Sequence, residues 1–147
     1  MAFKRQLLAI ASIVVFALLW NGLVHLFFLR EADLAIVAFG RPPQERSMVL
    51  GLGITVGISA LFLVSFLQWP HRGVRAGLRH GVFFGLLAGL LVDANQYLLY
   101  PLPASLALMW FAFGFVEFCI YGLIVGRIYP NEVAAQPHSA DARASCG

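Results

Sequence analysis

Charged residues are scarce in this chain. Asp, Glu, Lys and Arg make up 12% of its 147 residues, against about 25% in ordinary soluble domains. Hydrophobic residues make up 61%. This composition excludes the soluble class, and the length leaves no room for a separate globular enzyme beside a membrane part. The net charge of +3 comes from basic residues that flank apolar segments, so they are expected to set membrane topology and not to bind nucleic acid.

Cysteine is scarce too, and catalytic motifs are missing. Cys119 and Cys146 are the two cysteines, and they form neither a disulfide framework nor a metal-ligand spacing. The sequence has no phosphate-binding glycine loop and no nucleophile elbow. Haem ligation would need His25 and His80, which are expected near opposite membrane faces; His80 and His71 are assigned to a basic loop. We therefore expect no catalytic residues, no metal and no cofactor.

Four long apolar runs account for most of the chain. A hydrocarbon core of about 30 Å requires roughly 20 apolar residues in a helix. The expected membrane helices are residues 7–29, 48–69, 79–100 and 104–128. The first run is too long for a signal peptide, whose apolar region has about 7–15 residues. The sequence thus predicts an all-α integral membrane protein, an antiparallel four-helix bundle over residues 1–129, with a disordered tail at 130–147.

The basic residues are distributed unequally between the two sides of the predicted bundle. One side carries seven of them, Lys4, Arg5, Arg72, Arg75, Arg79, Arg127 and Arg143, and the other carries Arg30, Arg41 and Arg46. Because Lys and Arg favour the cytoplasmic side, both termini are predicted to be cytoplasmic, in a bacterial-type inner membrane. The external loop contains a short apolar run at 34–39, which is expected to form a helix on the membrane surface.

Glycine recurs every fourth residue in the third apolar segment. This row consists of Gly77, Gly81, Gly85 and Gly89. The same four-residue spacing occurs in two pairs, Gly53 with Gly57 and Gly122 with Gly126. A period of four keeps residues on one ridge of a helix. In a membrane, small residues on such a ridge allow another helix backbone to approach closely. The glycines are therefore predicted to be helix-packing positions, within the chain or toward a homo-oligomer or a larger membrane complex.

A few polar side chains are expected at membrane depth. Placing each of them there costs a few kcal/mol, so each is expected to have a structural or functional role. The candidates for one cluster are Asn21, His25, Asp93, Gln96 and Glu117. Asn21 and His25 share a helix face, as do Glu117 and Tyr121, because each pair is four residues apart. Such a cluster suits a proton relay or a cation site. The alternatives are interhelical hydrogen bonds for Asn21 and a hydrated helix end for Asp93 and Gln96.

Two classes of function follow from these features. The preferred expectation is an accessory or assembly subunit, not an enzyme, that acts through glycine-mediated helix packing. The alternative is a small oligomeric transporter or channel for protons, cations or a small solute, with Asp93 and Glu117 carrying the charge. A membrane-embedded enzyme or quinone site is a third hypothesis. The partners expected from sequence are the lipid bilayer and other membrane proteins.

Overall fold

The computed structural model describes residues 2–30 and 45–131, and every regular element in these ranges is helical. The elements are α1 (Ala2–Leu23), η1 (Val24–Phe28), α3 (Met48–Gln68), α4 (Val74–Ala88), η3 (Gly89–Ala94), α5 (Asn95–Leu99) and α6 (Ala104–Ile128). The segments η1 and η3 are π-helical and continue the helices before them. The expected surface helix at 34–39 and the tail beyond residue 131 lie outside the described residues.

Four helices in the described ranges are long and apolar enough to cross a membrane: Phe3–Phe28, Met48–Gln68, Val74–Leu99 and Ala104–Ile128. This confirms the all-helical class with four apolar helices and indicates a multi-pass membrane protein. The third helix begins at Val74, not near Arg79 as expected. The apolar run was a poor guide to this boundary, because Arg75 and Arg79 lie on an exposed face of the helix, where their charged ends need no apolar surroundings.

The ends of α3 are fixed by side-chain hydrogen bonds. At its start, the Ser47 hydroxyl accepts a hydrogen bond from the backbone N–H of Leu50, at 3.2 Å. At its end, the Arg72 guanidinium donates to the carbonyl oxygens of Leu67 and Trp69. These contacts satisfy backbone groups that have no partner inside the helix. The connection from α3 to α4 is therefore held at its α3 end by Arg72.

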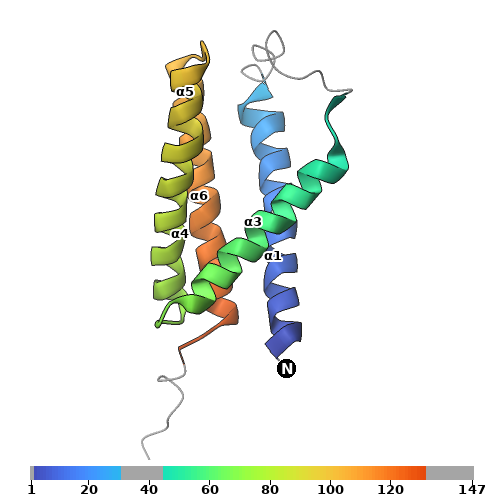
Figure 1. The fold of residues 1–147 in the computed structure, drawn as a ribbon, viewed down its shortest axis with the longest axis vertical. Helices are drawn as coiled ribbons and strands as arrows, with labels where there is room; N and C mark the ends of the chain where they lie inside the picture. Colours follow the sequence, from blue (N-terminus) through green and yellow to red (C-terminus); the bar gives the residue numbers. More distant parts are fainter. Residues whose placement is uncertain (1, 31–44, 132–147) are drawn as a thin grey trace, which may run out of the picture.

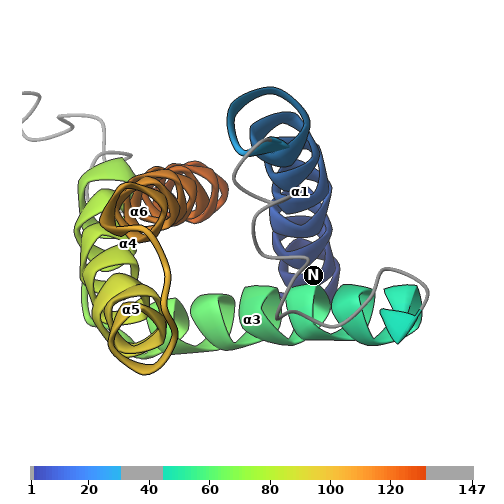
Figure 2. The same cartoon turned by 90° about the horizontal axis from the view of Figure 1, so that it is seen from above.

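The helices are arranged unevenly. Figure 1 shows α4 and α6 side by side, with α1 farther away and α3 crossing obliquely. From above, α3 lies along one side of the other helices, and its beginning extends beyond α1 (Figure 2). Consistent with this, residues 48–58 are exposed except for half-buried Thr55. The antiparallel packing of all four helices in a membrane stays a prediction.

The contact between α4 and α6 is made through glycine. A Cβ added at Gly77 would collide with the carbonyl oxygen of Gly122, and a Cβ at Gly122 would collide with that of Gly77. At this point the two backbones touch, which no larger residue permits. The other glycines at this contact are Gly81, Gly85, Gly89 and Gly126, whose added Cβ atoms would meet Phe118, Phe115, Phe111 and the Gly73–Val74 backbone. In contrast, Gly53 and Gly57 on α3 have no such neighbours within 4 Å.

The apolar core lies where the four helices converge. Its buried residues are Ala9, Ile13, Ala17, Phe62, Leu63, Phe66, Ala76, Tyr121 and Val125. A second cluster of Val24, Leu29, Leu102 and Leu106 lies toward the other end of α1. The α1 members of the first cluster are spaced by four residues, so they form one ridge of the helix. Along the first helix, Asn21 lies between Ala17 of the first cluster and Val24 of the second.

Candidate functional site

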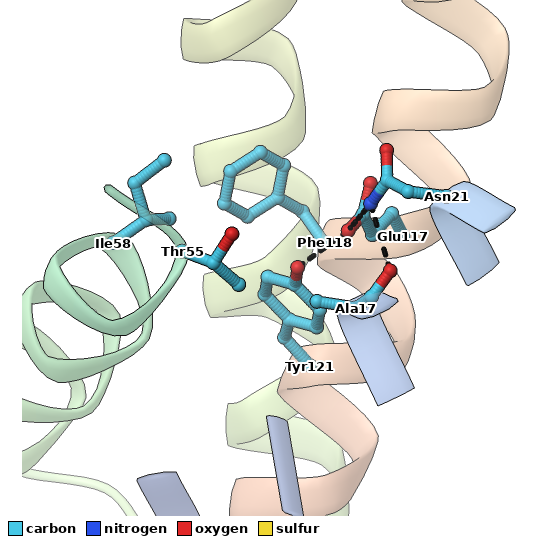
Figure 3. Close-up of a pocket in the computed structure, with 7 residues that line it drawn as sticks. All are labelled: Ala17, Asn21, Thr55, Ile58, Glu117, Phe118 and Tyr121. Atoms are coloured by element: carbon cyan, nitrogen blue, oxygen red, sulfur yellow. Dashed lines mark hydrogen bonds between the residues drawn. The ribbon is translucent and has the colours of Figure 1, made fainter. Parts of the chain in front are cut away.

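Glu117 lies near the middle of α6 and is bound by two side chains. The Tyr121 hydroxyl donates a hydrogen bond of 2.5 Å to Glu117 Oε1, and Asn21 Nδ2 donates one of 2.8 Å to the same oxygen (Figure 3). Asn21 Nδ2 also donates to the carbonyl oxygen of Ala17, at 2.9 Å. Both hydrogens of the Asn21 amide are therefore used. This arrangement fixes one carboxyl oxygen between α1 and α6.

A cavity of ≈ 250 Å³ adjoins this carboxyl group. Its lining residues are Ala17, Asn21, Thr55, Ile58, Glu117, Phe118 and Tyr121. Figure 3 shows Thr55 and Ile58 on α3, across the cavity from the Glu117 side chain. The Thr55 hydroxyl donates to the carbonyl oxygen of Gly51 at 3.1 Å, so its oxygen lone pairs can still accept. The polar groups around this space are mainly oxygen atoms.

A second cavity, of ≈ 180 Å³, lies on the other side of the Asn21–Glu117 pair. It is lined by Trp20, Asn21, Val24, His25, Leu29, Trp110, Phe113, Gly114 and Glu117. Its aromatic wall is fixed in part by Trp20, whose Nε1–H donates to the carbonyl oxygen of Phe113 at 3.3 Å. His25 reaches this cavity from the π-helical segment η1. Asn21 and Glu117 therefore face two cavities at once.

The structure separates Asp93 from Glu117. Asp93 is half-buried in η3 and lines a different cavity, of ≈ 230 Å³, between the third helix and the first part of α6. The other residues of that lining are Ala94, Tyr97, Ala104, Ala107, Leu108 and Phe111. Gln96 is half-buried on α5 and lines none of these three cavities. Of the five predicted residues, Asn21, His25 and Glu117 thus come together around the same carboxyl group.

Two residues of the site were missing from the predicted cluster. Tyr121 is a direct hydrogen-bond donor to Glu117, and Thr55 forms the opposite wall of the first cavity. The four-residue spacing of Glu117 and Tyr121 was the sequence signal for the first of them. No spacing along the chain could identify Thr55, because its position depends on the oblique path of α3.

His80 corrects one expectation. It was assigned to the basic loop, but it is fully buried on α4. Its Nε2 lies 3.0 Å from the Ser65 hydroxyl and 3.3 Å from the carbonyl oxygen of Phe62. Aromatic rings of Phe62, Phe66, Trp69 and Phe84 surround it at centroid distances of 4.7–5.6 Å. Because α4 begins earlier than expected, His80 falls on the helix face toward α3, away from Arg75 and Arg79.

Three residues of the predicted cluster, His25, Asp93 and Glu117, have side chains that can bind a metal, but they do not form one site, since Asp93 lies in its separate cavity. Among the residues that the structure describes, no three His, Cys, Asp or Glu side chains converge on one point. The donors around Glu117 are instead a carboxylate, a phenol, an amide and a hydroxyl. Oxygen donors of this kind suit a proton or a hard cation.

Comparisons of the chain with protein-family models, with curated proteins and with solved structures gave no match.

Proposed function

We propose that the chain is a multi-pass protein of a bacterial-type inner membrane, with both termini in the cytoplasm, and that Glu117 binds a proton or a small cation inside the bilayer. The four apolar helices support the membrane assignment, and the seven-to-three distribution of basic residues supports the orientation. In this reading the protein is a small transporter or channel, acting alone or as an oligomer.

The observation that carries this proposal is the position of the Glu117 carboxyl group between two cavities. An acid at the centre of a membrane helix costs about 2.5–3.5 kcal/mol on insertion scales. Tyr121 and Asn21 offset part of this cost by donating to Oε1. The cavities give a small ligand access to the same carboxyl group from two directions. Simple packing of α6 against α1 needs neither the acid nor the space.

The surface on which the accessory-subunit hypothesis mainly depended, the glycine row of the third helix, is buried within the chain. The glycine row of the third helix is covered by α6 of the same chain, so those glycines are not available to a partner. Of the predicted packing glycines, Gly53 and Gly57 stay uncovered, on the exposed first half of α3, residues 48–58. Assembly through this half-helix, with itself or with a larger complex, is our second candidate function, because the beginning of α3 extends beyond the other helices (Figure 2).

Flux measurements on Glu117→Gln test the first proposal. The amide keeps the size of the side chain and its hydrogen-bonding ability but cannot exchange a proton or carry charge. Proteoliposomes with a pH gradient, and then with gradients of Na⁺ and K⁺, should show flux for the wild type that falls by about tenfold or more in Glu117→Gln, a change of at least about 1.4 kcal/mol.

Asp93→Asn is the matched control, because it makes the same acid-to-amide change in a separate cavity. It should keep most of the flux. Wild-type vesicles that are no more permeable than protein-free vesicles to any of these ions would contradict the transport proposal and favour assembly through α3.

A further inference from the structure

A cavity of ≈ 310 Å³ with a strongly basic lining lies where α3 ends and α4 begins. The lining residues are Trp69, His71, Arg72, Arg75, Ala76, Arg79 and Asn131. The acidic side chains of the described ranges are Glu45, Asp93 and Glu117, and none of them lines this cavity. The site therefore gathers three guanidinium groups without a carboxylate of the described residues to balance them.

The three arginines have different roles. Arg72 is occupied, because it donates to the carbonyl oxygens of Phe66, Leu67 and Trp69 at the end of α3. Arg75 and Arg79 are exposed, and within the described part of the chain neither makes a hydrogen bond or an ion pair. They are four residues apart on α4, so their side chains are neighbours, and like charges at this spacing repel modestly. An anion between them would remove that repulsion.

The walls of this cavity are fixed by contacts that do not involve a ligand. The backbone N–H of Gly73 donates to the carbonyl oxygen of Tyr129 at 2.8 Å, which ties the α3–α4 connection to the end of α6. Gly73 has a φ of 92°, a conformation that other residues rarely adopt. A Cβ at Gly73 would lie 3.4 Å from Asn131. The backbone beside the basic cavity is thus fixed by contacts within the chain.

The position of the cavity along the helices places it at the level of the lipid headgroups. Trp69 directly follows the apolar helix α3, and tryptophan is enriched at the level of the lipid headgroups. Arg75 and Arg79 lie in the first turns of α4, before its apolar part. Guanidinium groups bind phosphate oxygens through paired, charge-assisted hydrogen bonds. Basic pockets between membrane helices are known to take anionic headgroups.

We propose that Arg75 and Arg79, with the Trp69 and Asn131 walls, form a binding site for the phosphate group of an anionic phospholipid. The proposal requires the membrane insertion proposed above, but not the role of Glu117. It also holds for either orientation of the protein, because it depends on the depth of the cavity and not on the side. Inorganic phosphate shares the recognised group and is the competing source.

The test is a titration of the purified full-length protein in neutral detergent, followed by thermal unfolding. Phosphatidylglycerol should raise the Tm of the wild type, whereas zwitterionic phosphatidylcholine should not. In Arg75→Gln/Arg79→Gln the apparent Kd for phosphatidylglycerol should rise by about tenfold or more, since two charge-assisted contacts are lost. Arg75→Lys/Arg79→Lys keeps the charge but loses the paired hydrogen-bond geometry of arginine. Its apparent Kd should lie between that of the wild type and that of the glutamine variant.

Lys4→Gln/Arg127→Gln removes the same charge from exposed positions at the same end of the molecule, outside this cavity, and should bind like the wild type. Wild-type affinity for phosphatidylglycerol in Arg75→Gln/Arg79→Gln, or an equal effect of phosphatidylcholine on the wild type, would overturn the proposal. If inorganic phosphate stabilises the wild type through the same two arginines at concentrations below those needed for the lipid, the lipid is the wrong source.

Discussion

At the scale of single residues, the site depends on one oxygen atom that accepts two hydrogen bonds. Glu117 Oε1 receives the Tyr121 hydroxyl from its own helix and the Asn21 amide from α1. The Tyr121 side chain is buried, and its hydroxyl donates its one hydrogen to Glu117. The tyrosine and the glutamate should therefore be coupled energetically, and the strength of that coupling can be measured.

Replacing Tyr121 with Phe should lower the free energy of unfolding by roughly 1–3 kcal/mol, because the carboxyl group loses a donor in a half-buried position. In a Glu117→Gln background the same replacement should cost less. Thermal or denaturant unfolding of the wild type, both single variants and the double variant measures the difference. Residues in direct contact give coupling energies of roughly 0.5–3 kcal/mol. Additive effects would show that the Glu117 carboxyl group binds the Tyr121 hydroxyl no more strongly than an amide does.

Some of this residue-level detail could be read from the sequence. Glu117 was recognisable as an acid inside a long apolar run, and its spacing from Tyr121 placed both on one face. His80 was misplaced because the apolar pattern put the start of its helix too late. The separation of Asp93 from Glu117 could not be foreseen, because it depends on how the third helix is rotated against α6 and on the π-helical turn at Gly89–Ala94, which departs from a period of 3.6 residues.

At the scale of elements, α4 and α6 form the closest helix pair. Gly77 and Gly122 allow the two backbones to touch, and Gly81, Gly85 and Gly126 continue the contact on either side. Without a hydrophobic driving force between helices in lipid, close packing of this kind carries much of the association. The pair is thus the most constrained part of the fold.

Gly77→Ala should destabilise the protein by about 1–3 kcal/mol, the usual cost of overpacking, because the new methyl group would overlap the backbone of α6. Gly53→Ala is the matched control. It has open space around the added carbon, and alanine is the better helix former by about 1 kcal/mol, so the control should be neutral or slightly stabilising. The readout is the Tm in detergent. Equal effects of the two substitutions would mean that α4 and α6 are not in backbone contact.

The glycine pattern shows which features of helix packing can be predicted from residue spacing alone. A four-residue period predicted a small-residue ridge on the third helix, and this ridge faces α6 in the structure. The same spacing in Gly53 and Gly57 looked equivalent, yet those glycines meet no neighbour. Spacing identifies the face of a helix but not the partner of that face, which depends on the directions of the other helices. The oblique course of α3 is a property of the assembled structure (Figure 1).

At the scale of the whole molecule, basic residues collect at one end. Figure 1 shows the start of α1, the α3–α4 connection and the end of α6 together at that end. These segments and the first turns of α4 carry Lys4, Arg5, Arg72, Arg75, Arg79 and Arg127. Some of them also hold the elements together, since Arg5 donates to the carbonyl oxygen of Ile128 and lies 4.5 Å from the centre of the Tyr129 ring. The remaining charge at this end is available to determine orientation.

The proposed orientation predicts that this basic end faces the cytoplasm. Single cysteines at Lys4 and Glu45, in a background without Cys119 and Cys146, would report the two sides, and both positions are exposed. In intact cells, a membrane-impermeant maleimide should label the cysteine at Glu45 and not the one at Lys4, which should react only after the membrane is permeabilised. A control with neither cysteine measures the background. Labelling of Lys4→Cys alone in intact cells would show that the orientation is the opposite of the proposed one. Equal labelling of both positions would contradict the proposal that the first helix crosses the membrane in one orientation.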